Sequence, residues 1–425
     1  MTGLVVLGLY VAIFCVSALI VVKLVQSAGQ AGFTSLKTVT FGDESAVRPN
    51  RVASVISIAT ILLLWGMFTG SSLLPRFMHA PGPFVGTISF DYTVEDGAGN
   101  TDDATVTVVV HPRDEKADKP DVAEGDGWAK NDTAVVAQWR TKLINVAKND
   151  VTADGAKPKV IAINGTPVGP GESVRIDGGR VNMTDKGTPN VDPYRGWQME
   201  PLYLPSPETV WQRTIKIFDE GFRNFTLGEH LGYSLFRVVV GFLLGALVGI
   251  PLGYAMGLSN WFRGWFDPIV EFMRPVPPLA LIPLVIIWAG IGEEGKIILL
   301  FLAALWIMAI AARAGVSGVK ISKVHAAYSL GAKPAQIMRY VIIPNSLPEI
   351  FTGARVAMGV CWGTVVAAEL VAAEQGAGMM IMTASKFQNT DIVIMGIILI
   401  GVIGFGIDLL MRWAESLLVP WKGKG

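Results

Sequence analysis

The sequence predicts an all-α polytopic membrane protein, with about seven transmembrane helices, that carries an inserted extracytoplasmic β-sandwich domain. Of its 425 residues 51% are hydrophobic and only 16% are charged, and its mean hydropathy of +0.46 is high for a soluble globular protein. Several segments reach the roughly 20 apolar residues that a spanning helix needs. Residues 78–202 instead alternate with the two-residue period of β-strands.

Seven apolar segments are candidate spans. We expect all of them to be helices, because an unpaired backbone cannot face lipid. They cover residues 4–25, 52–75, 234–258, 270–291, 296–318, 350–373 and 391–412. Cys15 and Cys361 both fall within spans, so a structural disulfide is not expected.

Basic residues predict the orientation of the chain. The first span has none before it, whereas Lys23, Lys37, Arg48 and Arg51 lie at its end or follow it. The positive-inside rule therefore places the N-terminus outside and loop 26–50 in the cytoplasm. Threading the remaining spans puts 78–202 outside and puts 319–349 and the C-terminal "KGKG" inside. A cleaved signal peptide is the alternative for the first span, but it needs a basic start and a shorter apolar core.

The insert at 78–202 has a composition of its own. It holds 19 acidic and 13 basic residues, a net charge of −6, so the zero net charge of the chain averages two unlike parts. "TISFDYTVEDGAGNTDDATVTVVV" alternates on both sides of a Gly/Asn/Asp turn and predicts a hairpin, and Asn164-Gly165 signals another. The acidic turns at Asp96, Asp102 and Asp103 are either solvated or a Ca²⁺ site, although EF-hand spacing is absent.

The order of the strands in the insert is unusual. The insert resembles bacterial cadherin-like and Ig-like repeats, but segment 86–112 is similar to the closing strands of such a repeat, and the opening strands follow it. A circularly permuted sandwich or two partial repeats would both explain this order. After the insert, Ser206 as N-cap and Pro207 at the first helical position predict an interfacial helix.

A loop at 322–348 separates the fifth and sixth spans. "KVHAAYSL", Gly331 and "KPAQIMRYVII" predict two short helices joined at a glycine, with Pro344 and Pro348 ending the second helix before the next span. Small side chains at Ala326 and Ala327 would let another protein approach closely. An ordinary cytoplasmic helical hairpin is the alternative.

This loop resembles the one shared by permeases of binding-protein-dependent type I ABC importers. The family pattern is Glu-Ala-Ala, three residues, Gly, nine residues, Ile, one residue and Leu-Pro, and the chain departs from it at His325, Val341 and Ile343. The resemblance implies a coupling helix that docks into a separate ATPase, where His325 puts any salt bridge from the usual Glu in doubt. The implied ATPase-coupling residues are His325, Ala326, Ala327, Gly331, Ala332, Gln336 and Pro344.

Two further segments are similar to the nitrate, sulfonate and taurine branch of these permeases. They are "WFDPIVEFMRPVPPLALIPLVIIWAGIGEEGKI" and "GVCWGTVVAAELVAAEQGAGMMI", and "TGARVAMGVCWGTVVAAELVAA" with "LVPWKG" is most similar to taurine permeases. The resemblance is dense over 206–420 and loose over 52–77. It implies an extra N-terminal helix and loop at 1–50, a first core helix at 51–77, the insert, and a permease core at 203–425.

The same resemblance implies partners and a solute. We expect a homodimer in the bacterial inner membrane, working with a cytoplasmic ABC ATPase dimer and a periplasmic solute-binding protein. Taurine is the expected solute, with nitrate, bicarbonate or another organic anion as alternatives. No GxxxxGK[ST] sequence is present, so we expect no ATP binding through that motif. No metal-ligand cluster or nucleophile–base spacing stands out either, so we expect a protein that is not itself an enzyme and has no cofactor or metal, and no nucleic-acid partner is expected.

Two other classes remain as rivals. A receptor or adhesin would use the Ig-like domain, and the seven spans and the loop argue against it. A secondary transporter would show inverted repeats, for which the sequence gives no internal symmetry.

Charged residues within spans are costly and are functional candidates. The translocation-path candidates are Glu271, Arg274, Trp362 and Glu369. Glu271 and Arg274, near the cytoplasmic start of the fourth span, form either a structural pair or a gate. Glu369 meets either a cationic or zwitterionic solute or a neighbouring helix.

Other side chains have structural expectations. Asp408 and Arg412 are expected to pair, and Gly241, Gly245, Gly249 and Gly253 predict a helix-packing stripe. His79, His111 and His230 are expected at the surface or the membrane interface.

Overall fold

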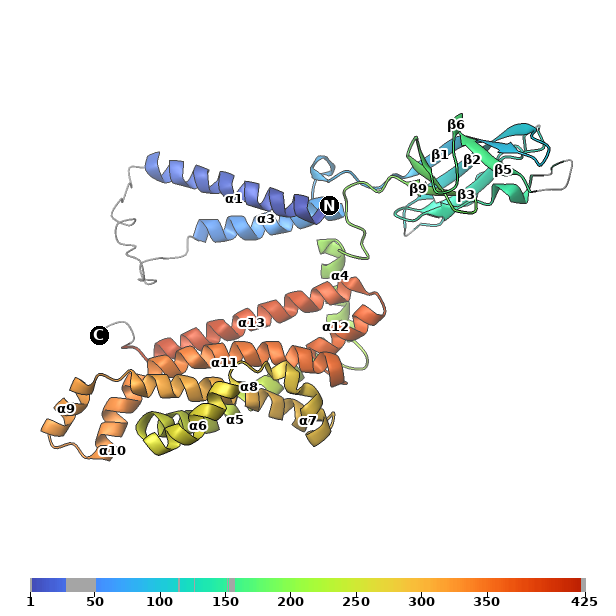
Figure 1. Cartoon of the computed structure of the whole chain (residues 1–425). Coiled ribbons are helices and arrows are strands. Elements are labelled where there is room, and N and C mark those ends of the chain that lie inside the picture. Colours follow the sequence, from blue (N-terminus) through green and yellow to red (C-terminus); the bar gives the residue numbers. More distant parts are fainter. Residues whose placement is uncertain are drawn as a thin grey trace. The chain divides into compact units, whose positions relative to one another are not determined.

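The computed structural model describes residues 2–27, 51–113, 115–125, 127–150, 152 and 157–421. It divides into two compact units, Met1–Glu208 and Thr209–Gly425. Among the described residues, the first unit holds the helices α1 (Thr2–Ser27) and α3 (Arg51–Thr69) and a β-sandwich, and the second is helical (Figure 1). Lys37, Arg48 and the C-terminal "KGKG", which the predicted topology uses, lie outside the described residues.

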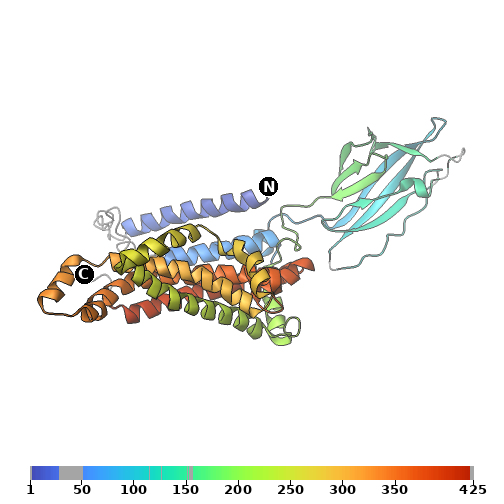
Figure 2. The ribbon, with the colours of Figure 1, turned by 60° about the horizontal axis from the view of Figure 1, so that its bottom comes forward.

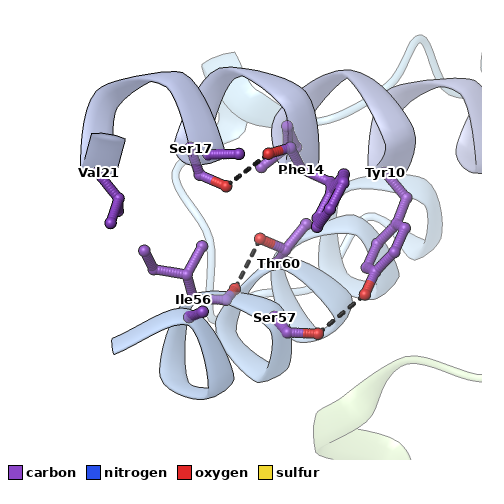
Figure 3. A pocket seen from close by; sticks show the side chains of 10 residues that line it. Tyr10, Phe14, Ser17, Val21, Ile56, Ser57 and Thr60 are labelled. Carbon is purple, nitrogen blue, oxygen red and sulfur yellow. Dashed lines mark hydrogen bonds between the residues drawn. The ribbon is translucent and has the colours of Figure 1, made fainter. Parts of the chain in front are cut away.

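The first unit begins with two apolar helices, α1 (Thr2–Ser27) and α3 (Arg51–Thr69), each long and apolar enough to cross a membrane. A groove of about 360 Å³ separates them (Figure 3). The Tyr10 hydroxyl and Ser57 Oγ hydrogen-bond across it at 2.8 Å, and Thr60 Oγ1 donates to the Ile56 carbonyl. Tyr10, Ser57 and Thr60 thus have hydrogen-bond partners on the two helices. The rest of the lining of the groove is mainly apolar.

The insert is a sandwich of two sheets. One sheet has the strand order β3-β2-β1-β5-β6 and the other β4-β9-β8-β7. The strands are β1 (Gly86–Glu95), β2 (Thr101–His111), β3 (Asp132–Ala137), β4 (Lys142–Leu143), β5 (Lys159–Ile163), β6 (Thr166–Pro167), β7 (Ser173–Ile176), β8 (Gly179–Met183) and β9 (Pro189–Pro193). Strands from both ends of the insert share one hydrophobic core. That arrangement favours a single sandwich over two partial repeats.

Both predicted hairpins are present. β1 and β2 pair antiparallel with Ile88 opposite Val108, so their apolar side chains share the buried face. Asn164 and Gly165, with φ of 46° and 71°, form the two-residue turn between β5 and β6. The carboxylate of Asp96 accepts backbone N–H groups within its own turn, at 2.9 Å from Ala98 and 2.8 Å from Asn100. These hydrogen bonds show that Asp96 stabilises the turn.

The chain enters and leaves the sandwich through two adjacent segments. The Phe84 N–H donates to the Tyr194 carbonyl at 2.8 Å, and the Trp197 N–H donates to Pro81 at 2.7 Å. At Gly196, with φ of 67°, a side chain would collide with the Gly82 backbone. The two ends of the sandwich therefore lie side by side.

The second unit packs α5, α8 and α11 side by side (Figures 1 and 2). Its α-helices are α4 (Pro207–Glu220, beginning in the first unit), α5 (Leu227–Leu258), α6 (Asn260–Met273), α7 (Ile282–Ala289), α8 (Glu293–Ser317), α9 (Ile321–Ser329), α10 (Pro334–Ile337), α11 (Ile343–Ala372), α12 (Ala377–Lys386) and α13 (Thr390–Leu418). Helix α4 begins at Pro207, as the sequence predicts.

The predicted glycine stripe is the contact between α5 and α8. A Cβ at Gly245 would lie 2.6 Å from Ala304 Cβ, and Gly241, Gly249 and Gly253 meet α8 as closely. Small residues here let the two backbones approach within a membrane-type interface.

The prediction of one continuous span at 270–291 is wrong. Helix α6 ends at Met273, and the chain from Pro278 to Ala289 is bent by 92° relative to it. Pro275, Pro277 and Pro278 remove backbone donors and restrict the residues before them, which breaks the helix. Within the described residues, six helices are long enough to span, or seven counting this bent pair.

Candidate functional site

The predicted loop forms a rigid elbow, which we define as residues 321–342, at one end of the second unit (Figure 1). Helix α9 ends in a Schellman motif, in which the Gly331 N–H donates to Tyr328 and the Ala332 N–H donates to Ala327. This motif requires a left-handed residue, and Gly331 has a φ of 80°. Helix α10 starts at Pro334, and the Gln336 side chain accepts the Lys333 N–H at 2.8 Å.

Apolar side chains on the elbow are exposed. Leu330 is 88% exposed, Tyr340 69% and Ile321 65%, and His325 and Ala326 are exposed on α9. Two contacts brace the base of the elbow: Lys323 Nζ donates to Asn345 Oδ1 at 2.6 Å, and Trp421 Nε1 donates to the Pro344 carbonyl at 3.1 Å.

Pro344 and Pro348 do not end the second helix, contrary to the prediction. A π-helical turn at Met338–Ile342 leads directly into α11, whose first turn holds Pro344 and whose interior holds Pro348. Proline is tolerated in a first helical turn because the N–H there has no intrahelical partner, and π-turns absorb local irregularity. The elbow is therefore continuous with a long helix.

The far end of α11 meets a second cluster, which we call the ionic hub: His230, Ser234, Arg237, Glu293, Lys296 and Glu369. Three members project from one face of α5 at positions i, i+4 and i+7. His230 is fully buried, so its predicted surface position is wrong. Its Nδ1 accepts the Gly376 N–H at 3.1 Å, which leaves Nε2 as the donor to the Phe222 carbonyl.

Arg237 is the centre of the hub and is 1% exposed. Its guanidinium binds both carboxylate oxygens of Glu293, at 2.5 and 2.6 Å, and Glu369 at 2.6 Å. It also donates to the Gln375 carbonyl at 2.9 Å. A bidentate Arg–carboxylate pair of this kind holds α5 and α8 in one geometry.

Glu369 fixes the start of α12. Its carboxylate accepts Ser234 Oγ at 2.8 Å and the Gly378 N–H at 3.0 Å. The Ser234 hydroxyl in turn accepts the Ala377 N–H at 3.0 Å. A side chain at Gly376, whose φ is 131°, would collide with the Glu369 carboxylate. Three successive N–H groups at the start of α12 are thus held by hub side chains.

The other charged candidates lie elsewhere. Glu271 pairs with Arg274 at 3.7 Å, as the spacing predicts, and also with Arg313 at 2.9 Å, at the C-terminal end of α6 rather than the start of a span. Arg412 pairs with Asp408 at 2.7 Å, as predicted. Trp362 and Glu369 are 7% and 1% exposed, so neither faces an open path within one protomer. Trp362 Nε1 donates to the Ile400 carbonyl.

Arg237 and Glu293 were not predicted as site residues, and His230 was expected at the surface or the membrane interface. The contacts that join them to other helices span 56 residues for Arg237–Glu293 and 146 residues for His230–Gly376, and the sequence alone does not indicate such pairings. The available signal was the His230, Ser234 and Arg237 spacing, which puts three polar side chains on one face of an apolar helix.

The long apolar helices that carry the elbow and the ionic hub are those of a multi-pass membrane protein. Comparisons with known proteins place it more closely. Residues 242–419 match the family described as "Binding-protein-dependent transport system inner membrane component". The chain is 47% identical to the taurine transport system permease protein TauC of Escherichia coli (strain K12), over 53% of this chain and 82% of that protein. The chain belongs to this family of multi-pass ABC transporter permeases.

Other relatives come from the same branch. The chain is 38% identical to the putative aliphatic sulfonates transport permease protein SsuC of Escherichia coli (strain K12), over 53% of this chain and 84% of that protein. It is 32% identical to the nitrate import permease protein NrtB of Synechocystis sp., over 54% and 86%. Residues 52–109 match the bacterial Ig domain family, a range that takes in α3 as well as β1 and most of β2.

Proposed function

We propose that this chain is the membrane-spanning subunit of an ATP-driven importer for a small sulfonate, with taurine as the solute. The elbow carries the proposal, because it offers exposed apolar side chains and small Ala residues at the end of a long helix. Identity to a taurine permease, 47% against 38% for an aliphatic sulfonate permease, supports the solute.

The elbow is the docking site for a separate ATPase. Exposed apolar side chains grouped on a short loop favour a protein partner. The coupling residues would be His325, Ala326, Ala327, Gly331, Ala332, Gln336 and Pro344. Helix α11 has 30 residues, which is about 45 Å at 1.5 Å per residue. A displacement of the elbow on closure of the ATPase would therefore be transmitted along α11 to the ionic hub. Transport follows from rigid-body movement of such elements.

The assembly is a homodimer, since one chain supplies one elbow and ABC ATPases act as a pair. The N-terminus and the β insert face outward, where a solute-binding protein docks, and 322–348 and the C-terminus face the cytoplasm of a bacterial inner membrane. We propose domains at 1–50, 51–77, 78–202 and 203–425.

Glu271 and Arg274 are the stronger path candidates. Their side chains are 46% and 65% exposed, and Arg274 borders a cavity of about 210 Å³ beside the proline bend. Irregular backbone at membrane depth is tolerated where it lines a cavity. Trp362 and Glu369 act behind this surface as supports.

The test is reconstitution. The chain is expressed with its ATPase and supplied with loaded binding protein in liposomes, and ATP-dependent uptake of labelled taurine is expected. Higher kcat/KM for nitrate or bicarbonate would favour the alternative anion importer. Failure of any ATPase to co-purify would favour a receptor or adhesin.

Gly331→Trp tests the elbow. Gly331 has open space around it, but its φ of 80° strains any side chain there. Gly331→Ala carries that strain without the bulk and should keep substrate-stimulated ATP hydrolysis, whereas Gly331→Trp should assemble in the membrane and lose the stimulation. Gly264→Trp, at another open glycine on α6, is the matched control and should keep stimulation. Normal stimulation in Gly331→Trp would overturn the docking assignment.

A further inference from the structure

A hollow of about 730 Å³ opens beside the ionic hub. Tyr233 of α5, Glu293 and Lys296 of α8, and Glu374 and Gln375 after α11 contribute to its lining. We propose that this hollow is a solute subsite of the permease that takes a small zwitterion bearing a sulfonate and an ammonium group. The proposal rests on the proposed function and names the chemistry that the permease itself recognises.

One side of the hollow suits an anionic group. The Lys296 side chain is 8% exposed, and its ammonium donates to Glu293 Oε1 at 2.9 Å. An ammonium has three donors, and no other partner for it is found among the described residues. Gly292, the N-cap of α8, also lines the hollow and offers no side-chain cap there. The N-terminus of this 25-residue helix therefore lies at the lining of the hollow together with the buried Lys296.

The other side suits a cation. Glu374 is exposed on the rim, and no ion-pair partner for it is found within the described part of the chain. Its backbone is fixed, because Arg237 binds the Gln375 carbonyl and His230 binds the Gly376 N–H. The Tyr233 ring also lines the hollow, and the Arg237 guanidinium lies 5.8 Å from its centroid.

The charge balance disfavours a simple anion. Arg237 and Lys296 are positive, whereas Glu293, Glu369 and Glu374 are negative, so the hub and the hollow together carry a charge of −1. A simple anion such as nitrate would meet this net negative charge. Taurine has no net charge and carries an ammonium two carbons from its sulfonate. Its sulfonate can therefore pair with Lys296 and its ammonium with Glu374.

The experiment measures binding to the purified permease–ATPase complex without the solute-binding protein. Labelled taurine is titrated, with ethanesulfonate, which lacks the amine, as competitor. Glu374→Gln should weaken taurine binding roughly tenfold, the size of one lost hydrogen bond to a charged group, and should remove the preference over ethanesulfonate. Glu294→Gln is the matched control, since this exposed neighbour does not line the hollow, and it should change neither. Lys296→Met should weaken both solutes, with assembly checked by size-exclusion chromatography.

The outcomes separate the two proposals. Unchanged taurine affinity and preference in Glu374→Gln would overturn the subsite. So would a wild-type complex that imports taurine but does not bind it without the binding protein, and that result would leave the proposed function standing. A complex that neither imports nor binds taurine would overturn both.

Discussion

Ion pairs in this chain differ most in the solvent exposure of their side chains. The side chains of Arg237 and Glu369 are 1% and 0% exposed, whereas those of Arg274 and Glu271 are 65% and 46% exposed. Burial removes hydration from both charges, so each partner of a buried pair depends on the other. An exposed pair is screened and contributes little.

Arg237→Met should therefore strongly destabilise the folded protein. It leaves Glu369 buried without its counter-charge, and we expect a loss of about 3–5 kcal/mol in unfolding free energy. Arg274→Met, the matched exposed case, should cost less than about 1 kcal/mol. Thermal unfolding of the detergent-solubilised protein measures both. The double variant Arg237→Met/Glu369→Leu should recover part of the loss, and equal effects of the two single variants would contradict this account.

A half-buried carboxylate in the β-sandwich predicts a pH dependence. Burial and, to a smaller extent, the nearby Asp150 carboxylate together raise the pKa of Asp132 from 3.8 to about 6, although the hydrogen bond from the Tyr92 hydroxyl lowers it. Asp132 Oδ2 lies 3.2 Å from the Tyr92 hydroxyl. Because the folded state holds this proton more tightly than the unfolded state, Asp132 destabilises the domain above about pH 6, and the penalty fades as the pH falls towards 4.

Asp132→Asn, which imitates the protonated form, tests this sign. At about pH 7.5 it should stabilise the isolated insert by about 1–2 kcal/mol, after discounting the shift for solvent screening, and at about pH 4.5 the gain should vanish. Urea unfolding at the two pH values measures it. Asp121→Asn, at an exposed loop carboxylate, is the control. A gain that is the same at both pH values would contradict the assignment.

The roles of individual residues could be predicted from the sequence where they depend on neighbours within a few positions along the chain. The Asp408–Arg412 pair follows from i, i+4 spacing, and Gly331 follows from the need for a positive φ at a helix end. Glu369 stood out as a charge in an apolar segment, but its partner Arg237 is 132 residues away. The choice between a solute contact and a helix contact depends on that tertiary partner.

At the scale of elements, periodicity found the helices and proline chemistry decided their continuity. Prolines broke the predicted span at Pro275 to Pro278, but Pro344 and Pro348, which were expected to end a helix, lie within α11. Clustered prolines remove several donors at once, whereas Pro344 follows a π-turn and Pro348 is a single proline in the helix interior. Sequence alone did not distinguish these cases, because the π-turn before Pro344 became visible only in the structure.

The α5–α8 contact predicts an asymmetry between glycines of one helix. Gly245→Leu should destabilise the protein by more than about 1–3 kcal/mol, because even a Cβ would lie 2.6 Å from Ala304 Cβ. Gly232→Ala, on the same helix with open space around it, should be neutral or stabilising by about 0.5–1 kcal/mol. Melting temperatures of the two variants give the comparison, and equal shifts would argue against close α5–α8 packing.

At the scale of the whole molecule, the insert has its own core and its own charge. All the buried residues of that core lie between Ile88 and Val191, and residues 78–202 carry a net charge of −6. The change of residue pattern predicted the domain, and the resemblance predicted the permease core around it. The pairing of the insert's two ends was not predictable, because it depends on backbone contacts between segments more than 100 residues apart.

Those paired ends make a deletion possible. Removing residues 83–195 and joining Gly82 to Gly196 through a short Gly/Ser linker closes a gap between backbones that already touch. Loop-closure entropy rises slowly with length, so the helices should fold as before. The deleted chain should keep assembly with the ATPase and basal hydrolysis, because the insert supplies none of the apolar helices that could span the membrane.

What the deletion should change is the encounter with the loaded solute-binding protein. On the proposed outer face, a domain of charge −6 would steer or shield a partner electrostatically, and salt screens such an effect over about 10 Å at 0.1 M. Stimulated hydrolysis titrated with binding protein at low and high salt should therefore show a salt dependence in the full chain that the deletion removes. A control that keeps the insert but replaces Glu115, Asp118, Asp121 and Glu124 with Gln or Asn should fall between the two, since it lowers the charge without removing the fold. Loss of basal hydrolysis in an assembled deletion variant would instead make the insert part of the transport mechanism.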